Sequence, residues 1–297
     1  MDTLLPGDRK TLARRAALLR LTARNLADSM RNGGFRSLYR GQGIEFDGVR
    51  EYLRGDDVRS IDWNVTARMG KPFVKVFEEE HELQVFLIID DSLSMNTGSH
   101  GKSRLATAHE AGALLTLAAA MNDSPVGAVF FDGGIRFSCV PKQGQDRMLL
   151  LLSKFDSIPR HRKNGSALTH AIKGAGKLLR KRSLVLVFSD FRTSGWEDAF
   201  TLLCLKNDVV AVRITDPIDE ALPGCGSLPF IDSETGIRRI LPTSVTSFRK
   251  MWSDYSRQQT ERWKETCIRR GAVPLLLSTE DDPSVVLTNF FASRERQ

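Results

Sequence analysis

Residues 84–90 read Gln-Val-Phe-Leu-Ile-Ile-Asp, and residues 91–95 continue as Asp-Ser-Leu-Ser-Met. The first stretch is a continuous apolar run that ends in an acidic residue. Such a run is typical of a central parallel strand that is buried on both faces. The polar residues behind it therefore predict a loop at the carboxyl end of this strand.

Apolar strands and helical segments alternate through the rest of the chain. Further strands are expected at 126–131, 135–140, 184–189, 209–214 and 273–277, and the second of these follows a hairpin signal at 132–134. Helices are expected at 104–121, 145–156, 168–181, 196–205, 246–270 and 283–293. This alternation predicts an α/β fold, a doubly wound and mostly parallel sheet with helices on both faces.

The composition differs before residue 81. Apolar positions at helical spacing predict a helix over 8–32 that ends at Asn32-Gly33-Gly34, and residues 35–80 are rich in glycine and charge, with an extended piece at 72–78. We therefore expect a first part over 1–80 and a sheet domain over 81–297. Within the second part, 216–244 is rich in Pro, Gly and Asp and predicts a long excursion from the core.

The net charge of +7 is concentrated in one segment of the 297 residues. Residues 9–40 carry nine basic side chains and one acidic side chain, so the other 265 residues sum to −1. A basic helix could bind nucleic acid, an anionic membrane or an acidic partner. Nucleic acid is disfavoured because Phe35 and Tyr39 are the only aromatic residues there; an arginine face exposed to solvent on a packed helix is the simpler interpretation.

Cysteine usage and hydropathy favour a cytoplasmic protein. The four cysteines form no Cys-x-x-Cys motif, which argues against a zinc knuckle and a thioredoxin-like site. No apolar run approaches the roughly 20 residues of a membrane helix, and the N-terminal residues lack the pattern of a signal peptide. Peripheral attachment at the inner membrane through the basic segment remains an option.

Three polar groups follow strands or precede a helix in the expected sheet. Asp90, Ser92 and Ser94 follow the first buried strand, Ser166 precedes the helix at 168, and Asp190 follows a later strand. Because ligands bind at the carboxyl ends of strands in open α/β sheets, these side chains are candidates for one site. Their hard oxygen atoms suit Mg²⁺, Mn²⁺ or Ca²⁺. The alternative is that they only cap helices and form turns.

These motifs resemble known families. The Asp-x-Ser-x-Ser-Met loop, Gly165-Ser166 and Ser189-Asp190 resemble a von Willebrand factor A domain. The string over 40–68, from Arg-Gly-x-Gly-x-Glu-Phe to Ile-Asp-Trp-x-x-x-Ala-Arg, resembles the DUF58 family of bacterial proteins more specifically. That family carries a von Willebrand A-like domain and is associated with MoxR-type AAA+ ATPases.

The resemblance implies a metal-ion-dependent adhesion site that binds Mg²⁺, or Mn²⁺ or Ca²⁺ in its place. Ser92 and Ser94 would ligate the metal directly, Asp90 directly or through water, and Ser166 and Asp190 would complete the set. Two positions depart from the family pattern: Ser166 stands where threonine is usual, and Phe191 stands where glycine is usual. Asp91 is an additional acid beside the site.

The expected function is a non-enzymatic adaptor that links a client protein to a MoxR-type AAA+ ATPase. Other von Willebrand A-domain proteins are further candidate partners, and no small-molecule substrate is expected. The residues expected to face a partner are Asp91, Arg50, Asp57, Arg59 and Trp63; the charged residues of 40–68 could instead form ion pairs that fasten this segment to the sheet. A metal-dependent hydrolase is disfavoured, because Ser92 occupies the position of the second carboxylate in phosphatases with an Asp-x-Asp loop.

Overall fold

The computed structural model describes residues 23–30, 44–79, 83–99, 101–157, 167–231 and 237–294. These residues form two compact units. One contains residues 23–30 together with 83–294, and the other contains 44–79. The sequence placed the boundary near residue 80 and grouped the basic helix with 35–80, whereas the structure places the described part of that helix in the same unit as the sheet.

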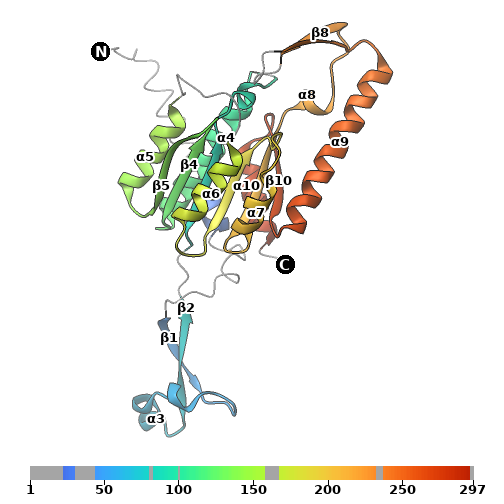
Figure 1. The fold of residues 1–297 in the computed structure, drawn as a ribbon. Coiled ribbons are helices and arrows are strands. Elements are labelled where there is room, and N and C mark those ends of the chain that lie inside the picture. The colour runs from blue at the N-terminus through green and yellow to red at the C-terminus, as the bar shows by residue number, and fades with distance from the viewer. Residues whose placement is uncertain are drawn as a thin grey trace, which may run out of the picture. The chain divides into compact units, whose positions relative to one another are not determined.

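A six-stranded sheet forms the centre of the larger unit, in the order β10-β7-β6-β3-β4-β5 (Figure 1). The strands are β3 Val85–Asp90, β4 Val126–Phe131, β5 Ile135–Lys142, β6 Leu184–Ser189, β7 Asp208–Thr215 and β10 Val273–Ser278. Only β5, at one edge, is antiparallel to its neighbour. The expected doubly wound, mostly parallel sheet is confirmed.

Helices cover both faces of this sheet because its central strands are apolar on both sides. Every residue of β3, β4 and β6 is buried. The helices are α4 Arg104–Met121, α5 Gln145–Asp156, α6 Leu168–Leu178, α7 Glu197–Cys204, α9 Thr246–Arg269 and α10 Pro283–Arg294. Helices α6 and α7 pack with one face in a single apolar cluster that includes Phe131, while Phe130 on the other face contacts His109 of α4.

The excursion after β7 carries regular structure that the sequence did not predict. It begins with the short helix α8 Pro217–Glu220 and continues as a hairpin of β8 Ser227–Ile231 and β9 Arg238–Pro242. Phe230 of this hairpin contacts Trp252 near the N-terminal end of α9, with ring centroids 6.1 Å apart. Figure 1 shows α9 beside the sheet with the hairpin at its N-terminal end.

Residues 23–30 are helical, and their apolar side chains Ala23, Leu26, Ala27 and Met30 are buried. Asn122 Nδ2, just beyond α4, donates a hydrogen bond to the carbonyl oxygen of Ala27 at 2.8 Å. Arg24 is exposed. The described part of the basic segment is thus an amphipathic helix packed on the sheet unit, and the rest of 9–40 lies outside the described residues.

The smaller unit is built on an antiparallel pair, β1 Ile44–Glu51 and β2 Phe73–Glu79. The 3₁₀ turn η1 Val58–Ser60 and the helix α3 Trp63–Met69 connect the two strands. Asp57 caps the turn, and Asp62 caps α3 by accepting hydrogen bonds from the amides of Asn64 and Val65. Two acidic residues of the 40–68 motif, Asp57 and Asp62, therefore serve as N-caps of η1 and α3.

In the part of the chain that the structure describes, no helix is both long enough and apolar enough to cross a membrane.

Candidate metal centre

The strand order reverses between β3 and β6, which are neighbours in the middle of the sheet. From β3 the chain proceeds to β4 and β5 on one side, and it then returns to β6, β7 and β10 on the other. At such a switch point the loops behind the two strands diverge and leave a crevice at the carboxyl edge. The residues that stand there are Asp90, at the end of β3, and Ser189 with Asp190, at the end of β6.

Asp90 is 1 % exposed and is held by the two loops. Its Oδ1 accepts a hydrogen bond from the amide of Ser92 at 2.9 Å, and its Oδ2 accepts one from Ser189 Oγ at 2.6 Å. The first contact closes a tight turn after β3, in which Ser92 begins the 3₁₀ turn η2 Leu93–Asn96. Asp90 therefore connects the carboxyl ends of both strands.

The two loop serines lie side by side. Ser92 is fully buried, and its Oγ is 3.1 Å from Ser94 Oγ. The Asp-x-Ser-x-Ser spacing thus brings one carboxylate and two hydroxyl groups into a single turn. Ser166, the remaining hydroxyl of the expected set, lies outside the described residues.

Asp190 supplies a second buried carboxylate, 4 % exposed. Its Oδ1 accepts a hydrogen bond from the amide of Arg192 at 3.1 Å. Its Oδ2 is buried and accepts no hydrogen bond from any residue that the structure describes, and Arg192 Nε lies 3.8 Å away. A buried carboxylate oxygen without a hydrogen bond is costly and calls for a further partner.

The pKa of Asp90 is raised to about 7, first by burial and then by the negative charge of Asp190. Hydrogen bonds from Ser189 and Ser92 oppose this rise without cancelling it. Two buried carboxylates therefore stand at this edge, and the environment of Asp90 disfavours its negative charge. A divalent cation would compensate both carboxylates at once.

The donor set fits a hard cation. Carboxylate and hydroxyl oxygens are the ligands that Mg²⁺, Mn²⁺ and Ca²⁺ prefer, and the free Asp190 Oδ2 is an available ligand atom. Across the described ranges, no three His, Cys, Asp or Glu side chains gather into a metal-holding cluster. A cation at this edge would therefore depend on Ser92 and Ser94 as well as on Asp90 and Asp190.

Phe191 stands where the resemblance led us to expect glycine, and its backbone has φ 53°, in the left-handed region. A residue with a side chain adopts this conformation at a cost of roughly 1 kcal/mol or more. Packing against Trp196 and Trp263, with ring centroids 5.2 and 5.4 Å away, and a 3.1 Å hydrogen bond from its amide to Ser189 Oγ hold it there. The loop thus keeps a glycine-like backbone beside Asp190.

Asp91 differs from the expectation that it faces a partner. It is only 3 % exposed, and its carboxylate is held by His109 Nε2 at 2.8 Å and Arg136 Nη1 at 3.2 Å. The other imidazole nitrogen of His109 is 2.9 Å from the carbonyl oxygen of Phe155. Asp91 therefore joins α4 and β5 inside the fold and presents no free carboxylate at the surface.

An ionic network that the sequence did not reveal lies next to the candidate centre. Arg104, 2 % exposed, donates to both carboxylate oxygens of Asp219 at 2.7 Å and also contacts Thr97. Arg192 donates to the same carboxylate at 2.6 Å. Asp219 comes from the helix in the excursion, 115 residues beyond Arg104, so no local motif signals this contact.

The other residues expected to face a partner lie in the smaller unit. Arg50 forms a bidentate pair with Asp56, with both distances 2.8 Å, and Asp57 caps the 3₁₀ turn. Trp63 is 68 % exposed, and Arg59 is also exposed. The described ion pairs of this unit join its own residues, and Trp63 and Arg59 remain predicted contact residues.

A family model described as "Protein of unknown function DUF58" matches residues 48–262. The chain belongs to the DUF58 family. It is 29 % identical over 304 residues to the uncharacterized protein Rv1480 of Mycobacterium tuberculosis, covering 99 % of this chain and 94 % of that protein.

Two solved structures share parts of the fold at low identity. The conserved hypothetical protein BatB from Bacteroides thetaiotaomicron is 14 % identical, with a TM-score of 0.47, over 72 % of this chain and 100 % of that one. The VWA domain of SpRpn10 is 11 % identical, with a TM-score of 0.39, over 71 % of this chain and 95 % of that one. The fold assignment rests on the strand order described above.

Proposed function

We propose that this DUF58 protein is a non-enzymatic adaptor that binds a divalent cation, Mg²⁺ first and Mn²⁺ or Ca²⁺ in its place, at the carboxyl edge of its sheet. Asp90, Ser92, Ser94 and Asp190 would hold the ion, with Ser166 as a further ligand. The observation that carries the proposal is a pair of buried carboxylates at one edge of the sheet. Among the described residues Asp190 Oδ2 accepts no hydrogen bond, and burial and the charge of Asp190 raise the pKa of Asp90 to about 7.

The bound cation would keep one coordination position for a carboxylate of a partner protein. We propose that it thereby couples a client to a MoxR-type AAA+ ATPase, with other von Willebrand A-domain proteins as further candidates, in the cytoplasm or peripherally at the inner membrane. The resemblance of residues 40–68 to DUF58 supports the ATPase as partner. The proposal needs no ATP site in this chain, since the ATPase would hydrolyse the nucleotide.

The environment of the serines supports binding over catalysis. A serine nucleophile needs a base within hydrogen-bond reach. Both ring nitrogens of His109 are occupied, by Asp91 and by the carbonyl oxygen of Phe155. Ser92 Oγ is instead paired with Ser94 Oγ. His109 is therefore not available as that base, and the pairing of the two hydroxyl groups supports a role for them as ligands.

Capture of the ATPase tests the adaptor proposal. The purified MoxR-type ATPase of the same genome should be retained by the immobilised chain in Mg²⁺, and retention should fall at least about tenfold with Asp90→Ala or Ser92→Ala, because each removes one ligand of the ion. The exposed residues Asp198 and Ser153 provide matched controls, Asp198→Ala and Ser153→Ala, which should retain it fully.

An EDTA wash would also remove the metal that the ATPase itself needs. Comparing the variants with wild type in Mg²⁺ therefore isolates the contribution of the site in this chain. Equal retention by wild type and by both ligand-site variants would contradict the metal-bridged mechanism.

The affinity for Mg²⁺ should depend on pH with a break near 7. Asp90 must be ionised to hold the cation, and its pKa is raised to about 7. We therefore expect the affinity to fall about tenfold for each pH unit below 7 and to level off above it. Calorimetric titration between pH 5.5 and 8.5 measures this dependence, and a flat profile would show that Asp90 is not a ligand.

A further inference from the structure

A recess of about 650 Å³ opens between α6 and α7. Its floor is apolar and includes Ile172, Leu179 and Leu203. Leu202 on its rim is 63 % exposed, so the apolar surface continues from the floor to the rim. A concave apolar surface of this size is the ordinary form of a binding site for side chains or small ligands.

Positive charge surrounds this floor. The lining includes six basic residues and no acidic one: Lys173, Lys177, Arg180, Lys181, Arg182 and Lys206. Arg182 is already paired with Asp208, at 2.6 Å. The other five are exposed, and none of them forms an ion pair with any residue in the described ranges. The recess therefore combines an apolar floor with a ring of uncompensated cations.

This groove lies at the amino-terminal edge of the sheet. Residues 179–182 directly precede β6, and Lys206 and Asn207 directly precede the parallel strand β7. The candidate metal centre stands at the opposite ends of the strands, behind β3 and β6. A partner held in the groove would not compete with one bound at the metal centre.

We propose that the groove between α6 and α7 binds an acidic peptide segment of a partner protein, whose carboxylates meet the ring of lysines and arginines and whose apolar side chains enter the recess. Charge complementarity selects an acidic occupant. The lining contains no aromatic residue on which nucleic-acid bases could stack. A flat membrane surface would not fill a concave floor, which favours a peptide.

The test uses the full chain and a fluorescein-labelled peptide of alternating glutamate and leucine, followed by anisotropy in EDTA. The wild type should bind it saturably below about 1 mM. The double variant Lys177→Glu/Lys206→Glu should bind at least about tenfold more weakly, and Leu202→Ser about threefold more weakly. The residues changed are exposed, so the fold should be retained, as circular dichroism would check.

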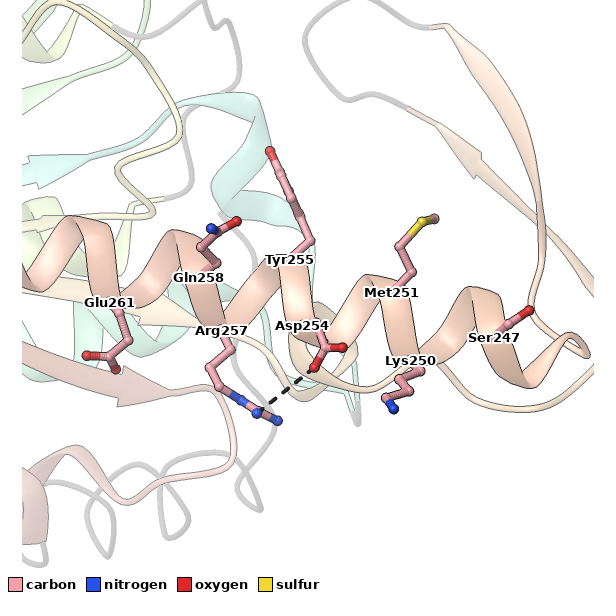
Figure 2. Close-up of a pocket in the computed structure, with 8 residues that line it drawn as sticks. All are labelled: Ser247, Lys250, Met251, Asp254, Tyr255, Arg257, Gln258 and Glu261. Atoms are coloured by element: carbon pink, nitrogen blue, oxygen red, sulfur yellow. Dashed lines mark ion pairs between the residues drawn. The ribbon is translucent and has the colours of Figure 1, made fainter.

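The outer face of α9 provides the matched control surface (Figure 2). Lys250 and Arg257 line a surface depression there together with Asp254 and Glu261, so charges of both signs are present. Lys250→Glu/Arg257→Glu changes the net charge by the same amount as the groove variant. It should leave the affinity for the peptide within about twofold.

Four results would overturn the proposal. The wild type could fail to bind below about 1 mM. A glutamate–glycine peptide could bind equally well, or the control variant could lose as much affinity as the groove variant. Finally, the groove variant could bind the peptide as the wild type does but lose binding to phosphatidylserine vesicles, which would assign the surface to a membrane. Because the assay is done in EDTA, a failure of the metal proposal would leave these results unchanged.

Discussion

Asp90→Asn should abolish the response of the protein to divalent cations and at the same time stabilise the metal-free form. At pH 8 we expect its free energy of unfolding without metal to exceed that of the wild type by about 2 kcal/mol. A variant that loses the cation response but gains stability would show that the charge of Asp90 serves binding at the expense of stability.

The stabilisation follows from the pKa of Asp90, which is about 7 in the folded state against a model value of 3.8. The folded protein then binds the proton more tightly than the unfolded chain, so stability falls as the pH rises between about 4 and 7 and stays lower above that range. Asparagine removes this charge. Its amide nitrogen can donate to Ser189 Oγ, the partner of Asp90 Oδ2, because a hydroxyl group can also accept.

Urea unfolding at pH 8, with and without Mg²⁺, measures both effects. The wild type should gain stability with Mg²⁺ concentration, and Asp90→Asn should gain none. The exposed Asp198 serves as control, since Asp198→Asn should behave as the wild type does. A variant that is less stable than wild type without metal, or that still responds to Mg²⁺, would contradict the role given to Asp90.

Arg104→Met should destabilise the protein by about 3–5 kcal/mol, the largest loss expected from a single change here. Arg104 is 2 % exposed and holds both oxygens of Asp219 at 2.7 Å, which ties α4 to the excursion behind β7. Methionine fills a similar volume, and among the described residues Arg192 is then the ionic partner left to Asp219. The loss is therefore that of a buried ionic contact rather than that of a cavity.

A surface pair of similar form provides the comparison. Arg182 contacts both oxygens of Asp208 at 2.6 and 3.2 Å, but it is 48 % exposed. Arg182→Met should therefore cost no more than about 1 kcal/mol. Denaturant titration of the two variants measures the difference, and equal losses would show that burial of Arg104 does not determine its contribution.

The core of the fold could be predicted from the sequence because its strands are continuous apolar runs. The bounds 126–131 and 184–189 agree with β4 and β6, and 104–121 agrees with α4. The hairpin β8–β9 was not predicted, because its strands are short and its second strand is largely exposed, which leaves little periodicity to detect.

For the candidate centre, the spacing of Asp90, Ser92 and Ser94 predicted that they share one turn. The sequence could not assign Asp91, because its partners His109 and Arg136 lie 18 and 45 positions away. Such long-range pairs leave no local pattern.

Binding of Mn²⁺ followed by electron paramagnetic resonance tests the central claim most directly, because it counts bound ions independently of any partner. At pH 8 we expect one tightly bound Mn²⁺ ion per chain of wild type and of Asp198→Asn. We expect none for Asp90→Asn, and a strongly weakened site for Ser92→Ala. A wild type that binds no Mn²⁺, or an Asp90→Asn variant that still binds one ion per chain, would contradict a metal centre at this edge of the sheet.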